Sequence, residues 1–129
     1  MKKKLLIIGS ILFGIVIIVT VSGIIYLMNG QKEMKEVEVN PVILNNLDDG
    51  TYIGQFKGYR WTNTIDVSIE NHQIIDIKVI KDQVFAQSYV KTQLFDEIKE
   101  QQSINVDSVT GATISSIAYL KAIEDALSK

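Results

Sequence analysis

The sequence predicts an α+β protein: an N-terminal transmembrane helix followed by a small antiparallel sheet of three or four strands packed with two helices. Three patterns predict this class. An uncharged apolar run occupies residues 5–28, and apolar and polar residues alternate on both sides of a turn over residues 65–79. Apolar residues then recur at helical spacing over residues 86–98 and 114–127. The first pattern is typical of a membrane span, the second of a half-buried hairpin, and the third of helices packed on a core.

The N-terminus has the features of a membrane anchor. Residues 1–4 contain three lysines, and the apolar run that follows has 24 residues, more than the roughly 20 that cross a bilayer. The lysines favour a cytoplasmic tail at residues 1–4 and an extracytoplasmic location for the rest. A cleavable signal peptide is the alternative, but its apolar core is usually about 7–15 residues long. We therefore expect residues 5–28 to be an uncleaved signal anchor.

Residues 29–47 are polar and rich in charge, and Asn40-Pro41 marks a break in this stretch. We expect it to be a stalk that lifts a domain at residues 48–129 off the membrane, and to serve as a spacer without contributing to a site.

Composition excludes several kinds of site. The chain has no cysteine, which excludes disulfides, thiolate metal sites and cysteinyl-flavin bonds, and its one histidine disfavours a metal centre. We expect no metal and no catalytic residue. The part after the anchor keeps ten basic and 15 acidic residues, a net charge of −5. This charge disfavours binding to nucleic acid and to anionic lipid.

The domain begins with predicted strands. A first strand is expected over residues 51–56, after the Asp49-Gly50 turn. The hairpin follows over residues 65–70 and 75–79, with Asn71-His72 as its turn.

A helix follows the hairpin. The apolar residues that recur every four positions are Ala86, Val90, Leu94 and Ile98, and Phe85 and Phe95 widen their stripe. This helix is expected to end in the polar residues 99–103. Residues 104–106 are expected to form a short edge strand, and residues 114–127 a terminal helix.

The polar loop at residues 107–113, Asp-Ser-Val-Thr-Gly-Ala-Thr, leads into the terminal helix. Gly111 allows a tight bend or a close approach to a ligand. Hydroxyls at Thr113, Ser115 and Ser116 lie where the first N–H groups of the helix are free. Two interpretations are open: the hydroxyls cap the helix, or the helix N-terminus and its hydroxyls hold a phosphate.

This loop resembles the Asp-x-x-Ser/Thr-Gly-Ala-Thr signature of the FMN-binding domain family, which includes the flavinylated subunits of bacterial sodium-pumping and Rnf-type complexes. Residues 48–54 resemble the Asp-Gly-x-Tyr-x-Gly opening strand of the same family. The resemblance covers residues 48–129. It implies that a flavin transferase joins FMN, through its phosphate, to Thr113.

The resemblance also implies the residues around the cofactor. They are Asp107, Ser108, Thr110, Gly111, Ala112 and Thr113, with Ser115 and Ser116 beside them. Asp107 either caps a turn or is recognised by the flavin transferase.

Aromatic residues are candidates to lie against a flavin ring. Tyr59 and Trp61, in the connection after the first strand, are the expected ring contacts. Tyr52 and Phe85 are expected to pack in the core instead. Arg60 is expected to be solvated, and pairing with a phosphate or a partner is its alternative.

These features predict a membrane-anchored, extracytoplasmic carrier of FMN. It is expected to be an electron-transfer flavoprotein more than an enzyme with its own substrate, working between membrane redox enzymes and outer electron acceptors. Two alternatives remain open: a reversible FMN binder or sensor, and a non-redox surface domain that binds a partner protein. The chain lacks the extra segments of the ion-pump flavin subunits, so a stand-alone carrier suits it better.

Overall fold

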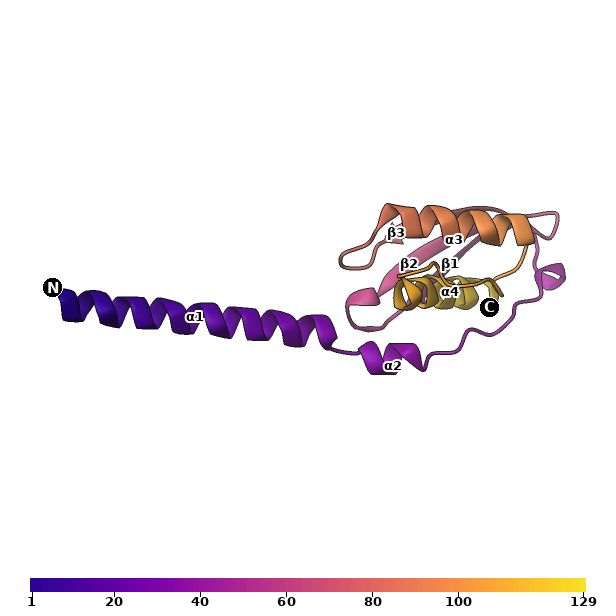
Figure 1. The fold of residues 1–129 in the computed structure, drawn as a ribbon. Helices are drawn as coiled ribbons and strands as arrows, with labels where there is room; N and C mark the ends of the chain where they lie inside the picture. The colour runs from indigo at the N-terminus through magenta and orange to yellow at the C-terminus, as the bar shows by residue number, and fades with distance from the viewer.

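The computed structural model describes residues 1–129. Its elements are α1 (Lys2–Met28), α2 (Gln31–Lys35), the 3₁₀ turn η1 (Leu44–Asn46), β1 (Gly50–Phe56), the 3₁₀ turn η2 (Tyr59–Trp61), β2 (Asn63–Glu70), β3 (Gln73–Lys81), α3 (Ser88–Gln101) and α4 (Thr113–Leu127). Figure 1 shows α1 projecting from a domain that contains the other elements. The predicted α+β class is confirmed.

The sheet is antiparallel, with strand order β1-β2-β3. Asn71 and His72 join β2 to β3 with φ values of 50° and 62°, as a two-residue hairpin turn of type I′ requires. The inward side chains of β2, Ile65, Val67 and Ile69, are at most 2% exposed. The alternating pattern therefore predicted this hairpin correctly.

Helices α3 and α4 share one hydrophobic core with the sheet. Close packing of α4 on β1 depends on Gly54, because a Cβ at this position would lie 1.9 Å from the carbonyl oxygen of Ala122. Phe95 of α3 meets Tyr119 of α4 edge to face, with ring centroids 5.6 Å apart. Both helices begin at the same end of the domain in Figure 1.

Two segments differ from the sequence-based expectation. Residues 104–106 form no strand: Ile104 fills the core with 3% exposure, but the segment has no ladder partner. Phe85 and Ala86 precede α3, which begins at Ser88. Phe85 has a φ of 61°, which an α-helix does not accommodate, and it is 67% exposed instead of buried. The four-residue spacing of apolar residues includes Ala86 by coincidence, because Ala86 lies in the loop before α3.

The chain packs against the domain from Gly30 onward, although residues 29–47 were expected to be a stalk. Gly30, with a φ of 80°, lies on the ring of Tyr59: a Cβ at Gly30 would be 2.1 Å from Cδ2 of that ring. Met34 is 2% exposed and packs in a small cluster with Trp61. Only Asn29 and Gly30 therefore separate α1 from α2.

The rest of this stretch is also attached. The backbone N–H and side-chain amide of Asn40 donate to the Glu124 carboxylate at 2.9 and 3.1 Å. Burial alone would raise the pKa of Glu124, but hydrogen bonds from Lys121 and Asn40 together lower it below its usual value. Glu124 is thus an ionised anchor for residues that precede the sheet.

We predict that Met34→Ala destabilises the domain by about 2–3 kcal/mol, because it removes a buried side chain and leaves a cavity beside Trp61. Urea unfolding of the full chain in detergent measures this change. The control Glu33→Ala alters an exposed residue of the same helix and should change the free energy of unfolding by less than about 0.5 kcal/mol. Equal stability of the two variants would mean that α2 is a free stalk.

Candidate functional site

A shallow pocket of about 330 Å³ opens at the N-terminus of α4. Three segments that are far apart in the sequence meet there: α2, η2 and the start of α4. The lining residues are Lys35, Arg60, Trp61, Gly111, Ala112, Thr113, Ile114 and Ser115. No carboxylate is among them, so the pocket is suited to an anion.

The first turn of α4 presents unpaired donors to this pocket. The N–H groups of Thr113, Ile114 and Ser115 donate to no acceptor in the protein, and no side chain caps the helix. The hydroxyls of Thr113, Ser115 and Ser116 therefore do not cap the N-terminus of α4. Free N–H groups and the helix dipole together favour a negatively charged group at this position.

The shape of the loop before α4 depends on Ser116 and Gly111. The fully buried Ser116 Oγ accepts a hydrogen bond from the Val109 N–H at 3.0 Å and donates to the Ala112 carbonyl at 2.8 Å. Gly111 has a φ of 78°, where a side chain would be strained. The Ser116 hydroxyl thus holds the loop and does not line the pocket.

Two cations border the pocket. The Arg60 guanidinium lies 4.2 Å above the Trp61 ring, and its buried Nε has no hydrogen-bond partner. Lys35 is exposed and forms no ion pair. Because Arg60 is only half-buried and lines the pocket, its guanidinium charge and the Lys35 ammonium attract an anion there.

The other predicted residues of the loop lie in different places. Thr113 is exposed at the pocket, so its hydroxyl is accessible. Asp107 and Thr110 are exposed and form no hydrogen bond with the protein, so Asp107 caps no turn. Ser108 is half-buried and lines a separate cleft beside Val39.

The aromatic candidates divide in the same way. Trp61 lines the pocket, but it is only 2% exposed and Arg60 covers one of its faces. Tyr59 is 50% exposed and lies over Gly30. Tyr52 packs against the core as expected, and its hydroxyl donates to the Asp48 carbonyl at 2.8 Å.

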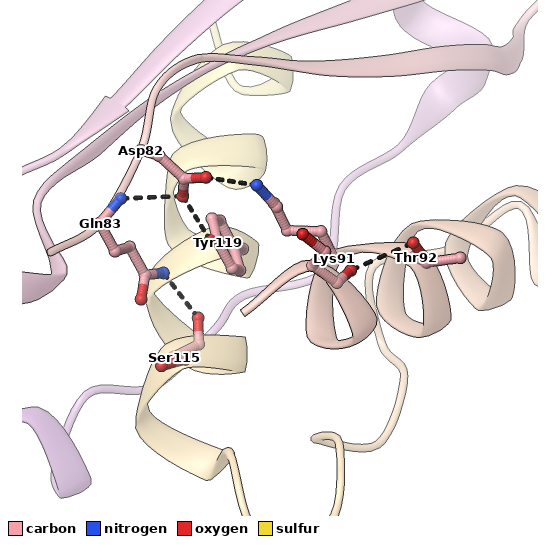
Figure 2. A network of polar contacts seen from close by, with 7 residues as sticks. Asp82, Gln83, Lys91, Thr92, Ser115 and Tyr119 are labelled. Carbon is pink, nitrogen blue, oxygen red and sulfur yellow. Dashed lines mark hydrogen bonds and ion pairs between the residues drawn. The ribbon is translucent and has the colours of Figure 1, made fainter. Parts of the chain in front are cut away.

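A polar network attaches the loop after β3 to the site (Figure 2). Asp82 accepts hydrogen bonds from Lys91 of α3 and, at 2.5 Å, from the Tyr119 hydroxyl of α4. The side-chain amide of Gln83 donates to the Ser115 carbonyl at 2.9 Å. The next residue, Val84, donates its N–H to the Arg60 carbonyl at 2.8 Å. The network thus positions both α4 and η2 at the pocket.

The pKa values of Asp82 and Tyr119 in this network shift in opposite directions. Burial alone would raise the pKa of Asp82, but hydrogen bonds from Lys91, Tyr119 and the Gln83 N–H together lower it below 3.8. Burial, and then the bond to ionised Asp82, raise the pKa of the Tyr119 hydroxyl above its usual 10.0. At neutral pH, Asp82 is therefore the acceptor and Tyr119 the donor.

Comparison with known proteins identifies the fold. Residues 58–128, more than half of the chain, match the family described as the FMN-binding domain. The chain belongs to the FMN-binding domain family. Its cofactor is FMN, and the free donors of α4 and the positive charges of Lys35 and Arg60 fit the phosphate of that cofactor.

A urocanate reductase from Eggerthella lenta is similar to this FMN-binding domain. The two chains are 42% identical over 69 residues, which are 50% of this chain and 11% of the reductase. The chain therefore corresponds to a small part of that reductase.

Sequence reasoning missed Lys35 and gave a phosphate contact for Arg60 only as an alternative. Lys35 was assigned to a spacer, and Arg60 was expected to be solvated. Only one signal was available for Lys35: its neighbour Met34 is a large apolar residue in a charged stretch. Arg60 directly precedes Trp61, but adjacency alone does not predict stacking.

Ionisation of Asp82 predicts a loss of stability in acid. Because its pKa is lower in the folded protein, its contribution is complete above the unfolded value near 3.8 and is lost as the pH falls through the folded pKa. Asp82→Asn should therefore be less stable than the wild type near neutral pH, and this difference should shrink below pH 3.8. Urea unfolding of the wild type and of Asp82→Asn, at neutral pH and below pH 3.8, measures this difference. Asp96→Asn, which alters an exposed carboxylate of α3, should show little difference at either pH.

Proposed function

We propose that this protein is a membrane-anchored flavoprotein that carries FMN at the start of α4, attached through phosphate to Thr113, and transfers electrons outside the cytoplasm. One observation carries the proposal: the accessible Thr113 hydroxyl, three unpaired N–H groups and the cations of Lys35 and Arg60 converge on a pocket without carboxylates.

A bond between Thr113 Oγ and the phosphorus of FMN forms with net loss of one water. The resulting phosphodiester is an anion beside the unpaired N–H groups and the Arg60 guanidinium, which stabilise it by charge-assisted hydrogen bonds. FMN supplies the redox chemistry when bound. Lys35, Arg60 and the free N–H groups of α4 would hold its phosphate.

A flavin transferase is the proposed partner for attachment. The lining of the pocket contains no carboxylate or histidine that would take the proton from Thr113 Oγ, so self-modification is not supported. Asp107 and Thr110 are exposed and have no partner within the protein, which leaves them available for recognition by another enzyme. This favours the recognition role for Asp107.

Reversible FMN binding is the second candidate function. The same N–H groups and Arg60 would bind a phosphate monoester without a covalent bond. A non-redox surface domain does not explain why free N–H groups and two cations converge on a pocket without carboxylates.

The proposed location follows from α1. This helix is long and apolar enough to cross a membrane, and none of its residues is buried against the domain. Its 27 residues extend about 40 Å, and a bilayer would cover their apolar side chains. With the lysines in the cytoplasm, the FMN site lies outside, where a covalent bond retains a cofactor that could not be replaced. Membrane redox enzymes or outer acceptors are the proposed electron partners.

We predict that co-export with a flavin transferase adds the mass of one FMN minus one water to the wild type and none to Thr113→Ala. Intact-mass spectrometry measures the adduct. Ser115→Ala removes another hydroxyl from the same pocket and should keep the adduct.

An adduct on Thr113→Ala would refute attachment at this residue. Unmodified wild type that releases flavin on denaturation would support the reversible binder instead. Wild type without any flavin would exclude both candidates.

The positive charges of Lys35 and Arg60 should make the pocket bind FMN more tightly than riboflavin, which has no phosphate. In full-length protein prepared without the transferase, Lys35→Gln should weaken FMN binding about three- to tenfold, and Arg60→Gln should weaken it further, because each removes a charge from the phosphate site. Affinity for riboflavin, which has no phosphate, should not change. Flavin fluorescence titration measures both ligands.

The matched control is Lys32→Gln, an exposed lysine of α2 that does not line the pocket. If Lys35→Gln and Lys32→Gln bind FMN equally, or if riboflavin affinity falls in parallel, Lys35 has no role at the phosphate.

A further inference from the structure

The end of the domain that carries the pocket faces the C-terminal end of α1. In Figure 1, η2, the loop between β3 and α3 and the start of α4 lie at the end of the domain nearest to α1, whereas η1 lies at the far end. The contacts agree with this view, because Gly30 touches Tyr59 and Met34 touches Trp61. The anchor and the site are therefore adjacent.

Exposed apolar side chains gather at this same end. Tyr59 is 50% exposed, Val84 46% and Phe85 67%. The hydrogen bond from the Val84 N–H to the Arg60 carbonyl places the second segment against η2. Phe85 has a φ of 61°, a conformation that is uncommon for a bulky residue and that leaves its ring in solvent. We call Tyr59, Val84 and Phe85 the apolar rim.

We propose that the apolar rim rests on the lipid surface, so that the flavin pocket opens toward the membrane that holds α1. This inference rests on the proposed membrane anchor, and it is independent of how FMN is attached. Aromatic side chains are favoured at the boundary between lipid and water, where an apolar ring leaves water without entering the bilayer core.

The short connection to α1 supports lipid as the occupant of this surface. Gly30, which touches Tyr59, follows Met28 by two residues, and two residues span at most about 7 Å. Because α2 is packed on the domain through Met34, only Asn29 and Gly30 remain to turn the domain away. A bilayer around α1 thus ends beside the apolar rim.

Local charge agrees with this orientation. The exported part is acidic as a whole, but Lys35 and Arg60 line the pocket beside the apolar rim, and exposed Lys57 lies two residues before η2. Basic side chains near the surface favour anionic lipid headgroups by about 1 kcal/mol each. The net charge of the exported part disfavours contact with anionic lipid, but α1 holds the apolar rim at the membrane surface despite this charge.

A redox partner must then reach the flavin at the membrane surface. An acceptor that moves in or along the bilayer approaches the pocket directly, whereas a large soluble protein is hindered on this side. The orientation therefore favours exchange with a membrane-resident partner.

The test uses single cysteines, which are unique because the chain has none of its own. Full-length protein without flavin is reconstituted in nanodiscs that contain doxyl-labelled lipid, and each cysteine carries a nitrobenzoxadiazole fluorophore. Phe85→Cys reports on the apolar rim. Ile43→Cys is the matched control, because Ile43 is equally exposed, at 66%, and precedes η1 at the far end. Ile15→Cys, within α1, reports on the anchor itself.

We expect lipid quenching at position 85 to exceed that at position 43 by about twofold or more, with a blue-shifted emission, and position 15 to be quenched most strongly. Quenching at position 15 with no difference between positions 85 and 43 would overturn the inference and leave the anchor intact. Absence of quenching at position 15 would overturn the anchor and the inference together.

A further variant tests the part played by α2. Met34→Asp places a charge in the buried contact with Trp61 and should release α2 from the domain. Quenching at position 85 should then fall toward that at position 43, while near-ultraviolet circular dichroism confirms that the domain remains folded. Undiminished quenching would overturn the role of α2 in setting the orientation.

Discussion

Unpaired donors at the start of α4 are the constraint on which the rest of the site depends. Three N–H groups of the first turn have no acceptor, and the buried Arg60 Nε beside them has none either. Water bonds to these exposed N–H groups when no ligand is present, but an anion also gains from the helix dipole and from the charge of Arg60, so the site favours an anion. The pocket at this position has no carboxylate in its lining, and α2, η2 and the start of α4 form it together.

Packing around α4 brings those segments together. Gly54 lets β1 approach the backbone of α4, and η2 follows directly from that strand. On the other side, Asp82 ties the loop after β3 to α3 and α4 through Lys91 and Tyr119. The loop then holds Arg60 by a backbone hydrogen bond. The pocket is thus a consequence of tertiary contacts, and the signature sequence supplies only one of its walls.

Features that depend on residues close together in the sequence were predictable, whereas features that depend on contacts across the fold were not. The hairpin at residues 65–79 and the helix after residue 113 depend on local periodicity and turn chemistry, so the sequence predicted both closely. Phe85 was misplaced because helical spacing says nothing about a left-handed φ in the preceding loop. Lys35 was missed, and a phosphate contact of Arg60 was only an alternative, because their positions depend on contacts across the fold, through Met34 on Trp61 and Val84 on Arg60.

The packing of α2 changes how the membrane anchor is understood. A free stalk would let an acidic domain move away from the lipid and present its pocket in any direction. The buried Met34 and the contact of Gly30 with Tyr59 instead join the anchor to the wall of the pocket. Lys35, which lies outside the residues that match the family, belongs both to α2, beside the proposed anchor, and to the proposed phosphate site. If both proposals hold, orientation at the membrane and retention of the cofactor depend on the same five-residue helix.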